Sequence, residues 1–175
     1  MACPLTSGFD FECDDSVGGI KLGSIKISQW ENIDSYTVTA GEVTALTQVA
    51  LTNFYEYKIK KEIADAVSSE THDPEMGTTF IETVMNFTLN KLTKEKNVEM
   101  KLLAGKPVVI LYQDMNDTWH IMGLTTGAEK MGGTNQSATG KASGDLNGYT
   151  LGFTSKEKDY PYTVDATVVA GLTVA

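Results

Sequence analysis

The hydrophobic pattern is clearest at residues 108–123, where an apolar run, a polar turn and a second short apolar run follow one another. The first run, residues 108–112, is unbroken and rich in β-branched side chains, which predicts a strand buried on both faces. A turn is then predicted by short side chains that hydrogen-bond to nearby backbone and tolerate positive φ: Asp114, Asn116 and Asp117. In the returning strand, Trp119 and Ile121 share one face and their neighbours share the other. This hairpin is expected at the centre of a β-rich domain.

Further strands are predicted by alternating or β-branched runs along the rest of the chain. They cover residues 20–28, 36–51, 80–92, 149–153 and 162–169. The second of these runs is broken at Ala40-Gly41, which predicts a hairpin turn there. Asn147-Gly148 predicts another hairpin turn, because an Asn-Gly step suits the backbone of type I′ turns.

Residues 54–67 fit two structures. Tyr55 and Tyr57 alternate with charged neighbours, as in a strand, whereas Ile59, Ile63 and Ala66 would also form one face of a helix. The aromatic pair and the β-rich surroundings favour a strand, which is the structure we predict.

One segment, at about residues 94–104, has a helical pattern. Thr93 can accept a hydrogen bond as the N-cap, and Gly105 followed by Pro107 predicts the end of the helix. The apolar side chains of one face are expected to pack on the sheet: Val98, Leu102 and Leu103.

Together these elements predict a mainly β fold with seven or eight strands and one flanking α-helix. Strands and helices do not alternate, so we expect a β-sandwich or a partly closed barrel. The chain length suits a single domain, at residues 17–175, preceded by an extended arm at residues 1–16. Residues 68–79 are polar and aperiodic and predict a long loop, which at this length tends to be functional or mobile.

Charge adds a constraint on partners. The chain has 14 Lys and Arg against 23 Asp and Glu, a formal net charge of −9. Tight binding to nucleic acid through neutralised phosphates needs clustered cations, so this balance disfavours it. An acidic surface would suit a protein along which DNA slides without sticking, although solubility alone is the simpler explanation.

Neither a membrane segment nor a secretory route is indicated. No apolar run approaches the roughly 20 residues of a membrane helix, and residues 1–15 lack the pattern of a signal peptide. We therefore expect assembly in a cytoplasm and no membrane partner. Cys3 and Cys13 fit no zinc-site spacing and are expected to be free thiols, with a structural bridge as the alternative.

The sequence contains no catalytic constellation. A nucleophilic enzyme needs a Ser or Cys activated by an oriented histidine, and the two histidines are interpreted as structural: His72 in the polar loop and His120 on a strand face. The Asx-rich turn lacks the glycine and glutamate of a calcium loop. Met131-Gly132-Gly133 lacks the ending of a phosphate-binding loop. We predict no enzymatic activity, no metal and no cofactor.

Three segments together form a pattern, at residues 107–114, 118–127 and 139–154. A strand ending in Asp is followed by Trp-x-x-x-Gly, then by a further Gly, and then by a Gly-Asp-x-Asn-Gly-Tyr-x-Leu strand. This pattern resembles tail tube and related virion proteins of tailed bacteriophages. The opening, from Cys3-Pro4 to Cys13-Asp14 and on through residues 17–21, is similar to structural proteins in phages of Bacteroidetes-type hosts.

The resemblance implies a β-sandwich flanked by one helix, with subunits that close into rings, commonly hexamers. Stacked rings would form a tail tube through which phage DNA passes without specific binding. The implied partners are copies of the chain and other virion tail proteins, and the implied location is the virion tail after assembly in the host cytoplasm. Contacts within or between rings are implied for residues of the arm and of the long loop: Phe9, Phe11, Ser68, Glu70, His72, Asp73, Glu75 and Met76.

A separate argument from strand edges also favours assembly. A β-rich chain must protect its edge strands, and closing a ring with identical neighbours removes those edges. Two other functions stay open at this point. One is a capsid decoration or fibre module that binds host glycans, and the other is a neck or ring protein of a short-tailed phage.

Overall fold

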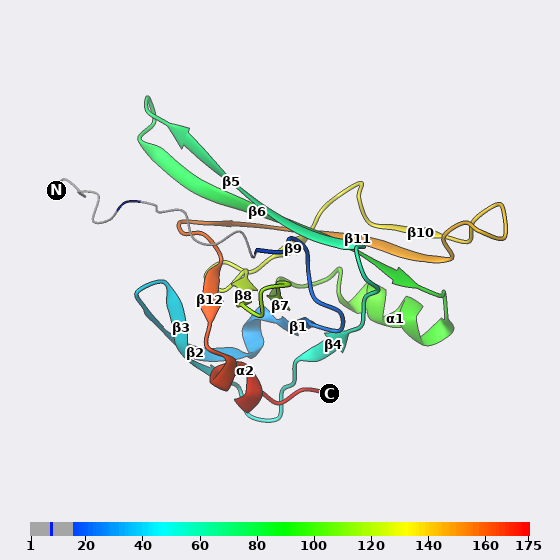
Figure 1. The fold of residues 1–175 in the computed structure, drawn as a ribbon, viewed down its shortest axis with the longest axis horizontal. Coiled ribbons are helices and arrows are strands. Elements are labelled where there is room, and N and C mark those ends of the chain that lie inside the picture. The colour runs from blue at the N-terminus through cyan, green and yellow to red at the C-terminus, as the bar shows by residue number, and fades with distance from the viewer. Residues whose placement is uncertain (1–7, 9–15) are drawn as a thin grey trace.

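The centre of the fold is the strand that was expected to be buried on both faces. In the computed structural model, which describes residue 8 and residues 16–175, strand β7 (Val108–Gln113) pairs with β8 (Trp119–Met122) across the predicted turn (Figure 1). Side chains of β7 alternate between two apolar clusters: Val108, Ile110 and Tyr112 enter one, and Val109 and Leu111 enter the other. The prediction of a doubly buried strand is confirmed.

Two sheets make up the fold. The larger contains β7 and β8 together with β1 (Ile25–Gln29), β2 (Ile33–Thr39), β3 (Glu42–Gln48), β4 (Tyr55–Tyr57) and β12 (Tyr162–Val164). Its strand order is β2-β3-β12-β8-β7-β1-β4. The smaller contains β5 (Ala64–Asp73), β6 (Thr78–Asn90), β9 (Glu129–Lys130), β10 (Gln136–Ala138) and β11 (Gly148–Glu157). Its order is β10-β11-β6-β5, with β9 paired to β11.

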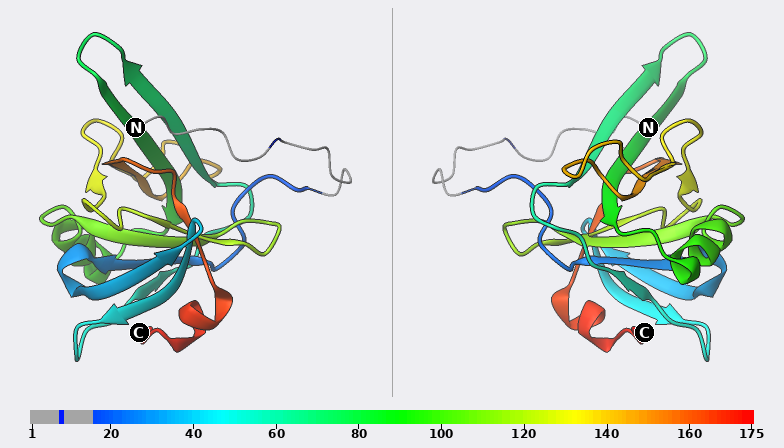
Figure 2. Two further views of the ribbon diagram at one scale, coloured as in Figure 1. Left: turned by 90° about the vertical axis from the view of Figure 1, so that its left-hand side faces the viewer. Right: turned by 90° about the vertical axis from the view of Figure 1, so that its right-hand side faces the viewer.

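The sheets are not closed into a barrel, so the fold is mainly β and sandwich-like, as predicted (Figure 2). The described residues form twelve strands where the sequence predicted seven or eight. Part of the difference comes from β9 and β10, which at two and three residues are too short to leave an alternating pattern. The rest comes from residues 54–73, where one predicted strand and part of a predicted loop form the two strands β4 and β5.

The first apolar cluster lies between the two sheets and is called the inter-sheet core below. It combines side chains of β1 and β7 with Met85 and Phe87 of β6 and with Leu151 and Phe153 of β11. The rings of Phe87 and Phe153 stack with their centroids 5.9 Å apart. Each fully buried side chain of this size stabilises the fold by roughly 1.5–3 kcal/mol. These contacts therefore hold the smaller sheet against the central strand.

The second cluster lies on the other face of the larger sheet, where the C-terminal segment covers it. Helix α2 (Ala166–Gly171) contributes Val169, and the segment after it contributes Leu172. The chain end then joins the residues before β4. The N–H of Phe54 donates to the carbonyl oxygen of Thr173 at 2.9 Å, and the N–H of Ala175 donates to that of Phe54 at 2.9 Å.

The predicted strand at residues 162–169 is wrong beyond Val164. Strand β12 ends there, and α2 begins with Asp165 as its N-cap, because Asp165 Oδ1 accepts a hydrogen bond from the N–H of Thr167 at 2.8 Å. The helical turn places Val169 in the second cluster. Its burial outweighs the low helix propensity of β-branched residues.

The predicted long loop at residues 68–79 is also wrong. These residues form the far half of a hairpin in which β5 and β6 pair from Ala64 opposite Phe87 to Asp73 opposite Thr78. Residues 54–67 contain β4 and the start of β5, so the choice of strand over helix is confirmed for those parts. The loop prediction failed because residues 69–79 are polar on both faces and show no alternation.

Helix α1 (Lys94–Leu102) has the predicted N-cap, with Thr93 Oγ1 accepting a hydrogen bond from the N–H of Lys96 at 3.3 Å. Its predicted apolar face is wrong in part. Val98 and Leu102 are 55% and 59% exposed, whereas Met100 and Leu103 pack on the inter-sheet core. The helix is therefore seated by its C-terminal turn, and part of its apolar surface stays uncovered.

Two predicted turns have different outcomes. Ala40 and Gly41 have φ values of 52° and 87° and connect β2 to β3 as predicted. Asn147-Gly148 is not a hairpin turn, because Gly148 is already the first residue of β11 and pairs with Ala138 of β10. A Cβ added to Gly148 would come 2.1 Å from the carbonyl oxygen of Leu89, so glycine is needed there for the close approach of β6.

The N-terminal predictions are tested only in part. Ile20 forms an isolated bridge with Asp114, and β1 begins at Ile25 rather than at residue 20. A turn separates the two, in which Ser24 Oγ donates to the carbonyl oxygen of Lys21 at 2.6 Å. The predicted arm, with Cys3, Cys13, Phe9 and Phe11, lies outside the described residues apart from Gly8 and Ser16.

Candidate assembly surface

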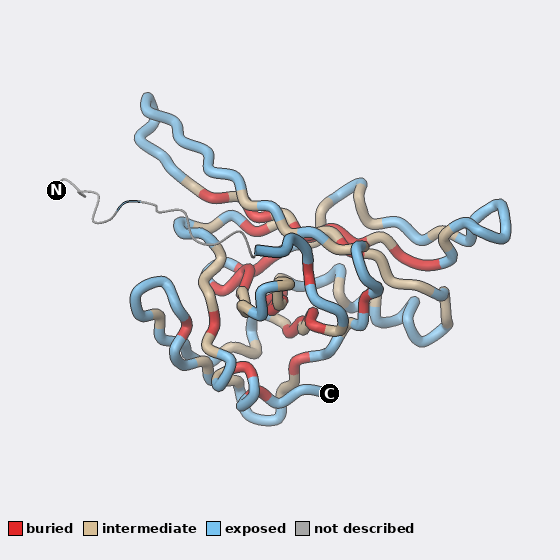
Figure 3. Tube along the Cα trace, in the orientation of Figure 1, coloured by how far each residue is buried: buried red, intermediate tan, exposed pale blue. Residues whose placement is uncertain are grey.

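The β5–β6 hairpin extends beyond the rest of the sandwich. Ten residue pairs join its strands. Every residue from 69 to 79 is exposed, and Figure 3 shows this half of the hairpin as a continuous exposed segment. At roughly 3.3 Å per residue, the exposed part of β5 is roughly 16 Å long. This half of the hairpin contributes no buried side chain to the core, and among the described residues nothing covers either of its faces.

The tip of the hairpin is ordered by its own polar groups. Asp73 Oδ1 accepts hydrogen bonds from the N–H groups of Glu75 at 2.9 Å and Met76 at 3.1 Å. Asp before Pro74 is typical of a type I turn, and Gly77 follows with a φ of 65°. His72 Nδ1 lies 2.7 Å from Thr79 Oγ1 across the strands, in β5 rather than in the predicted loop.

The residues predicted to contact neighbouring subunits fall into three groups. Five of them are exposed on the outer half of the hairpin: Glu70, His72, Asp73, Glu75 and Met76. Ser68 is half-buried at the base of this part, where its Oγ lies 2.9 Å from Thr83 Oγ1 across the strands. Phe9 and Phe11 lie outside the described residues.

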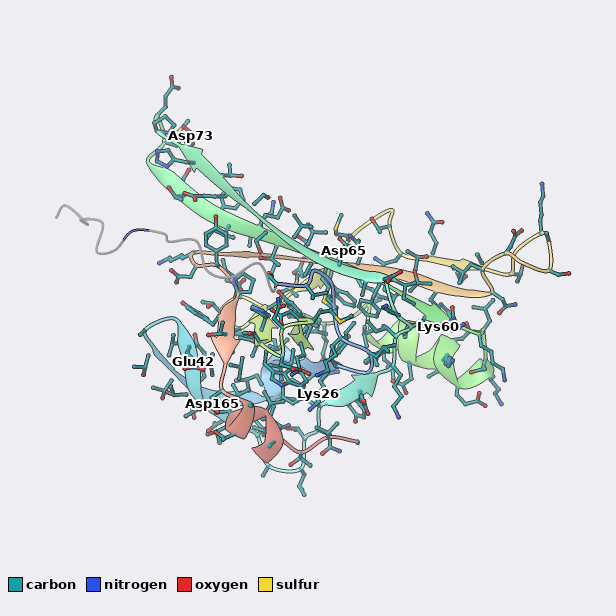
Figure 4. The ribbon with its side chains drawn as sticks, viewed as in Figure 1. Lys26, Glu42, Lys60, Asp65, Asp73 and Asp165 are labelled. Atoms are coloured by element: carbon teal, nitrogen blue, oxygen red, sulfur yellow. The ribbon has the colours of Figure 1, made fainter. Side chains whose placement is uncertain are left out.

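The two ends of the molecule carry opposite charge. The outer part of the hairpin, residues 69–79, contains three carboxylates and no lysine or arginine: Glu70, Asp73 and Glu75. Residues 54–62 and 91–106, around β4 and α1, contain eight lysines and four glutamates. In Figure 4, Asp73 marks the hairpin tip and Lys60 lies on the side of the molecule that carries α1.

A groove of about 690 Å³ opens between α1 and the edge of the larger sheet that β1 and β4 form. Its apolar wall includes Tyr55 and Leu102, which are 54% and 59% exposed. The sequence analysis did not predict this groove. Tyr55 and Leu102, on its two walls, lie 47 residues apart in the chain, and the sequence signal was an apolar residue, Leu102, beside a basic one.

Charged side chains of both signs line the groove. Neither Lys58 nor Lys96 forms an ion pair with the described residues, and Lys96 Nζ instead donates to the carbonyl oxygen of Asn90 at 2.9 Å. Lys106 is paired with Glu31 at 2.8 Å. Burial, with smaller contributions from Glu99 and Tyr55, raises the pKa of Tyr57 to about 12, so this phenol is neutral. The groove thus combines an apolar wall with lysines, Lys58, Lys96 and Lys106, and with two carboxylates, Glu56 and Glu99.

His120 lies on a strand face, as predicted, and supports the turn before it. Its Nε2 is 3.2 Å from Asp114 Oδ2, and its ring stacks on Tyr112 at 5.3 Å between centroids. In the part of the chain that the structure describes, no three His, Cys, Asp or Glu side chains are grouped so as to hold a metal ion. The helices of that part are all too short or too polar to cross a membrane.

The fold and this surface define a class of protein: mainly β, sandwich-like, with a projecting acidic hairpin and a lysine-lined groove. Neither a protein family, a curated protein nor a solved structure matches the chain. The resemblance to phage tail tube proteins stays a prediction. Function therefore has to be argued from the surface itself.

Proposed function

We propose that this chain is a structural subunit that assembles with copies of itself into a ring, and that stacked rings form the tail tube of a tailed bacteriophage. The main support is the projecting half of the β5–β6 hairpin. It is exposed on both faces, yet it is ordered by its backbone ladder and by the Asp73 turn. An ordered element that packs on nothing in the described part of its own chain is suited to contact with a neighbour.

Open strand edges also support self-assembly. Among the described strands, β5 and β10 end the smaller sheet, and β2 and β4 end the larger one. Strand β5 is ten residues long and pairs on one side only within that part of the chain. Unpaired edges of this length promote pairing with other chains, and a closed ring of identical subunits covers them.

The acidity of the chain agrees with the proposed channel. A net charge of −9 disfavours binding to phosphates, and a negative wall lets DNA move past without sticking. No catalytic role is included in the proposal, because the residues that could supply one, such as His120 and Asp114, are engaged in holding a turn.

The test is the assembly state of the purified full chain, measured by light scattering after size exclusion and by negative-stain electron microscopy. We expect rings, or tubes of stacked rings with a central channel. A chain that stays monomeric at every concentration would contradict the proposal. In virions that carry the chain, antibodies should label the tail, whereas label on the head would favour a capsid decoration protein instead.

A further inference from the structure

We infer that the hairpin tip of one copy docks into the groove beside α1 of a second copy. This inference rests on the proposed self-assembly and adds to it the pair of surfaces by which the copies join. Three observations carry it: the positions of the two surfaces, their apolar groups and their charges.

The two surfaces lie at opposite ends of the molecule. The tip of the β5–β6 hairpin projects at one end, and α1 lies at the other (Figures 1 and 4). A tip therefore cannot reach the groove of its own chain, and contact between the two surfaces joins different copies. Such a head-to-tail contact repeats from copy to copy, and it produces a ring if the rotation closes or a filament if it does not.

The apolar groups of the two surfaces match. Met76 is 76% exposed at the tip, and the groove exposes Tyr55 and Leu102. Methionine is unbranched and flexible, so it fills irregular apolar sites well. The groove volume of about 690 Å³ lies within the roughly 300–1,000 Å³ typical of ligand sites, which leaves room for Met76 and part of the turn.

Charge sets the direction of docking. The outer hairpin carries Glu70, Asp73 and Glu75 and no cation, whereas Lys58 and Lys96 line the groove without an ion pair among the described residues. Glu56 and Glu99 also line the groove and would repel the tip carboxylates. The docked tip therefore places its carboxylates beside Lys58 and Lys96. Complementary charges of this kind favour the correct partner surface and exclude like-charged ones, such as tip against tip.

Charge reversal in matched pairs tests the contact. One variant reverses the tip, Glu70→Lys with Glu75→Lys, and leaves Asp73 to hold the turn. A second reverses the groove, Lys58→Glu with Lys96→Glu. A control, Glu42→Lys with Glu129→Lys, changes the net charge as much as the tip variant at exposed sites on β3 and β9. Circular dichroism establishes that each variant is folded.

Each reversed variant alone should assemble only at a protein concentration about tenfold or more above that of the wild type, because like charges then face each other. An equimolar mixture of the two should assemble again, since every tip meets a groove of opposite charge. The control should assemble as the wild type does. Unimpaired assembly of either reversed variant, or a mixture that stays dissociated, would overturn the inference while leaving self-assembly intact. A monomeric wild type would overturn both.

Discussion

Asp114 shows how one side chain can support the central hairpin. Its Oδ1 accepts hydrogen bonds from the N–H groups of Asn116 at 2.8 Å and Thr118 at 2.9 Å, and its Oδ2 lies 3.2 Å from His120. Burial raises the pKa of Asp114, but the hydrogen bonds from Thr118, His120 and Asn116 together outweigh it and hold the pKa below its ordinary value. The ionised carboxylate therefore stabilises the folded state.

Asp114→Ala should lower the free energy of unfolding by about 1–2 kcal/mol at neutral pH, because hydrogen bonds to a charged group are lost. The pKa of Asp114 in the folded protein lies below its unfolded value of about 3.9. The extra stability of the wild type over Asp114→Ala is therefore fully present above that value and is lost as pH falls through the folded pKa. Urea unfolding at neutral and acid pH measures the difference. Asp34→Ala, at an exposed site on β2, controls for net charge; a loss independent of pH would argue against this role.

In the β5–β6 hairpin, the residues that stabilise the fold lie at the base, and the residues proposed to contact a neighbour lie at the tip. At its base, Met85 and Phe87 are buried in the inter-sheet core. Ser68 and Thr83 bond across the strands where the sandwich ends, so Ser68 belongs to the structure of the hairpin itself. Beyond that point no residue of the turn or of its flanking strands, residues 69–79, is buried. Removing the tip should therefore cost little stability.

Replacing residues 72–79 with Asn-Gly joins Thr71 to its cross-strand partner Phe80 by a two-residue turn. The shortened chain should unfold within about 1 kcal/mol of the wild type, since only exposed residues are lost. It should fail to form large assemblies in light scattering. Deleting residues 141–144, from the exposed loop between β10 and β11, is the matched control and should leave assembly unchanged. Normal rings from the shortened chain would exclude the hairpin as a contact.

Across the whole molecule, protection from solvent decreases from the central sheet outward. Strand β7 is covered on both faces by the two clusters, the smaller sheet packs on the inter-sheet core, and the hairpin tip is covered by nothing in the described chain. Local opening requires less free energy where fewer apolar contacts are broken. Charge follows the same axis, with the acidic tip at one end and the lysine-rich groove at the other.

Hydrogen exchange should reflect this arrangement. In dilute, unassembled protein, amides of β7 should exchange slowest and those of residues 75–77 fastest. In the assembled protein, added protection should appear in two separate regions, the tip at residues 70–79 and the groove at β4 and α1. Mass spectrometry of peptides from both states measures the change. Protection at the tip without protection at α1 would place the tip on another surface.

Local chemistry in the sequence determined several elements correctly. The β-branched run at residues 108–112, the Asx residues that follow it, the turn at Ala40-Gly41 and the N-cap at Thr93 all act through neighbours a few residues away. Short-range hydrogen bonds and side-chain alternation leave a pattern that can be recognised without the fold. The mainly β, two-layer architecture followed from those elements.

Tertiary structure alone decided the features on which the proposed function depends. Residues 69–73 and 78–79 became strands because β6 supplies a ladder to β5, although neither exposed face is apolar. Gly148 became a strand residue through its approach to Leu89, and Val169 entered a helix because the second cluster buried it. The groove exists only where Tyr55 and Leu102 meet. In each case the deciding partner lies far along the chain, and short-range propensity carries no information about it.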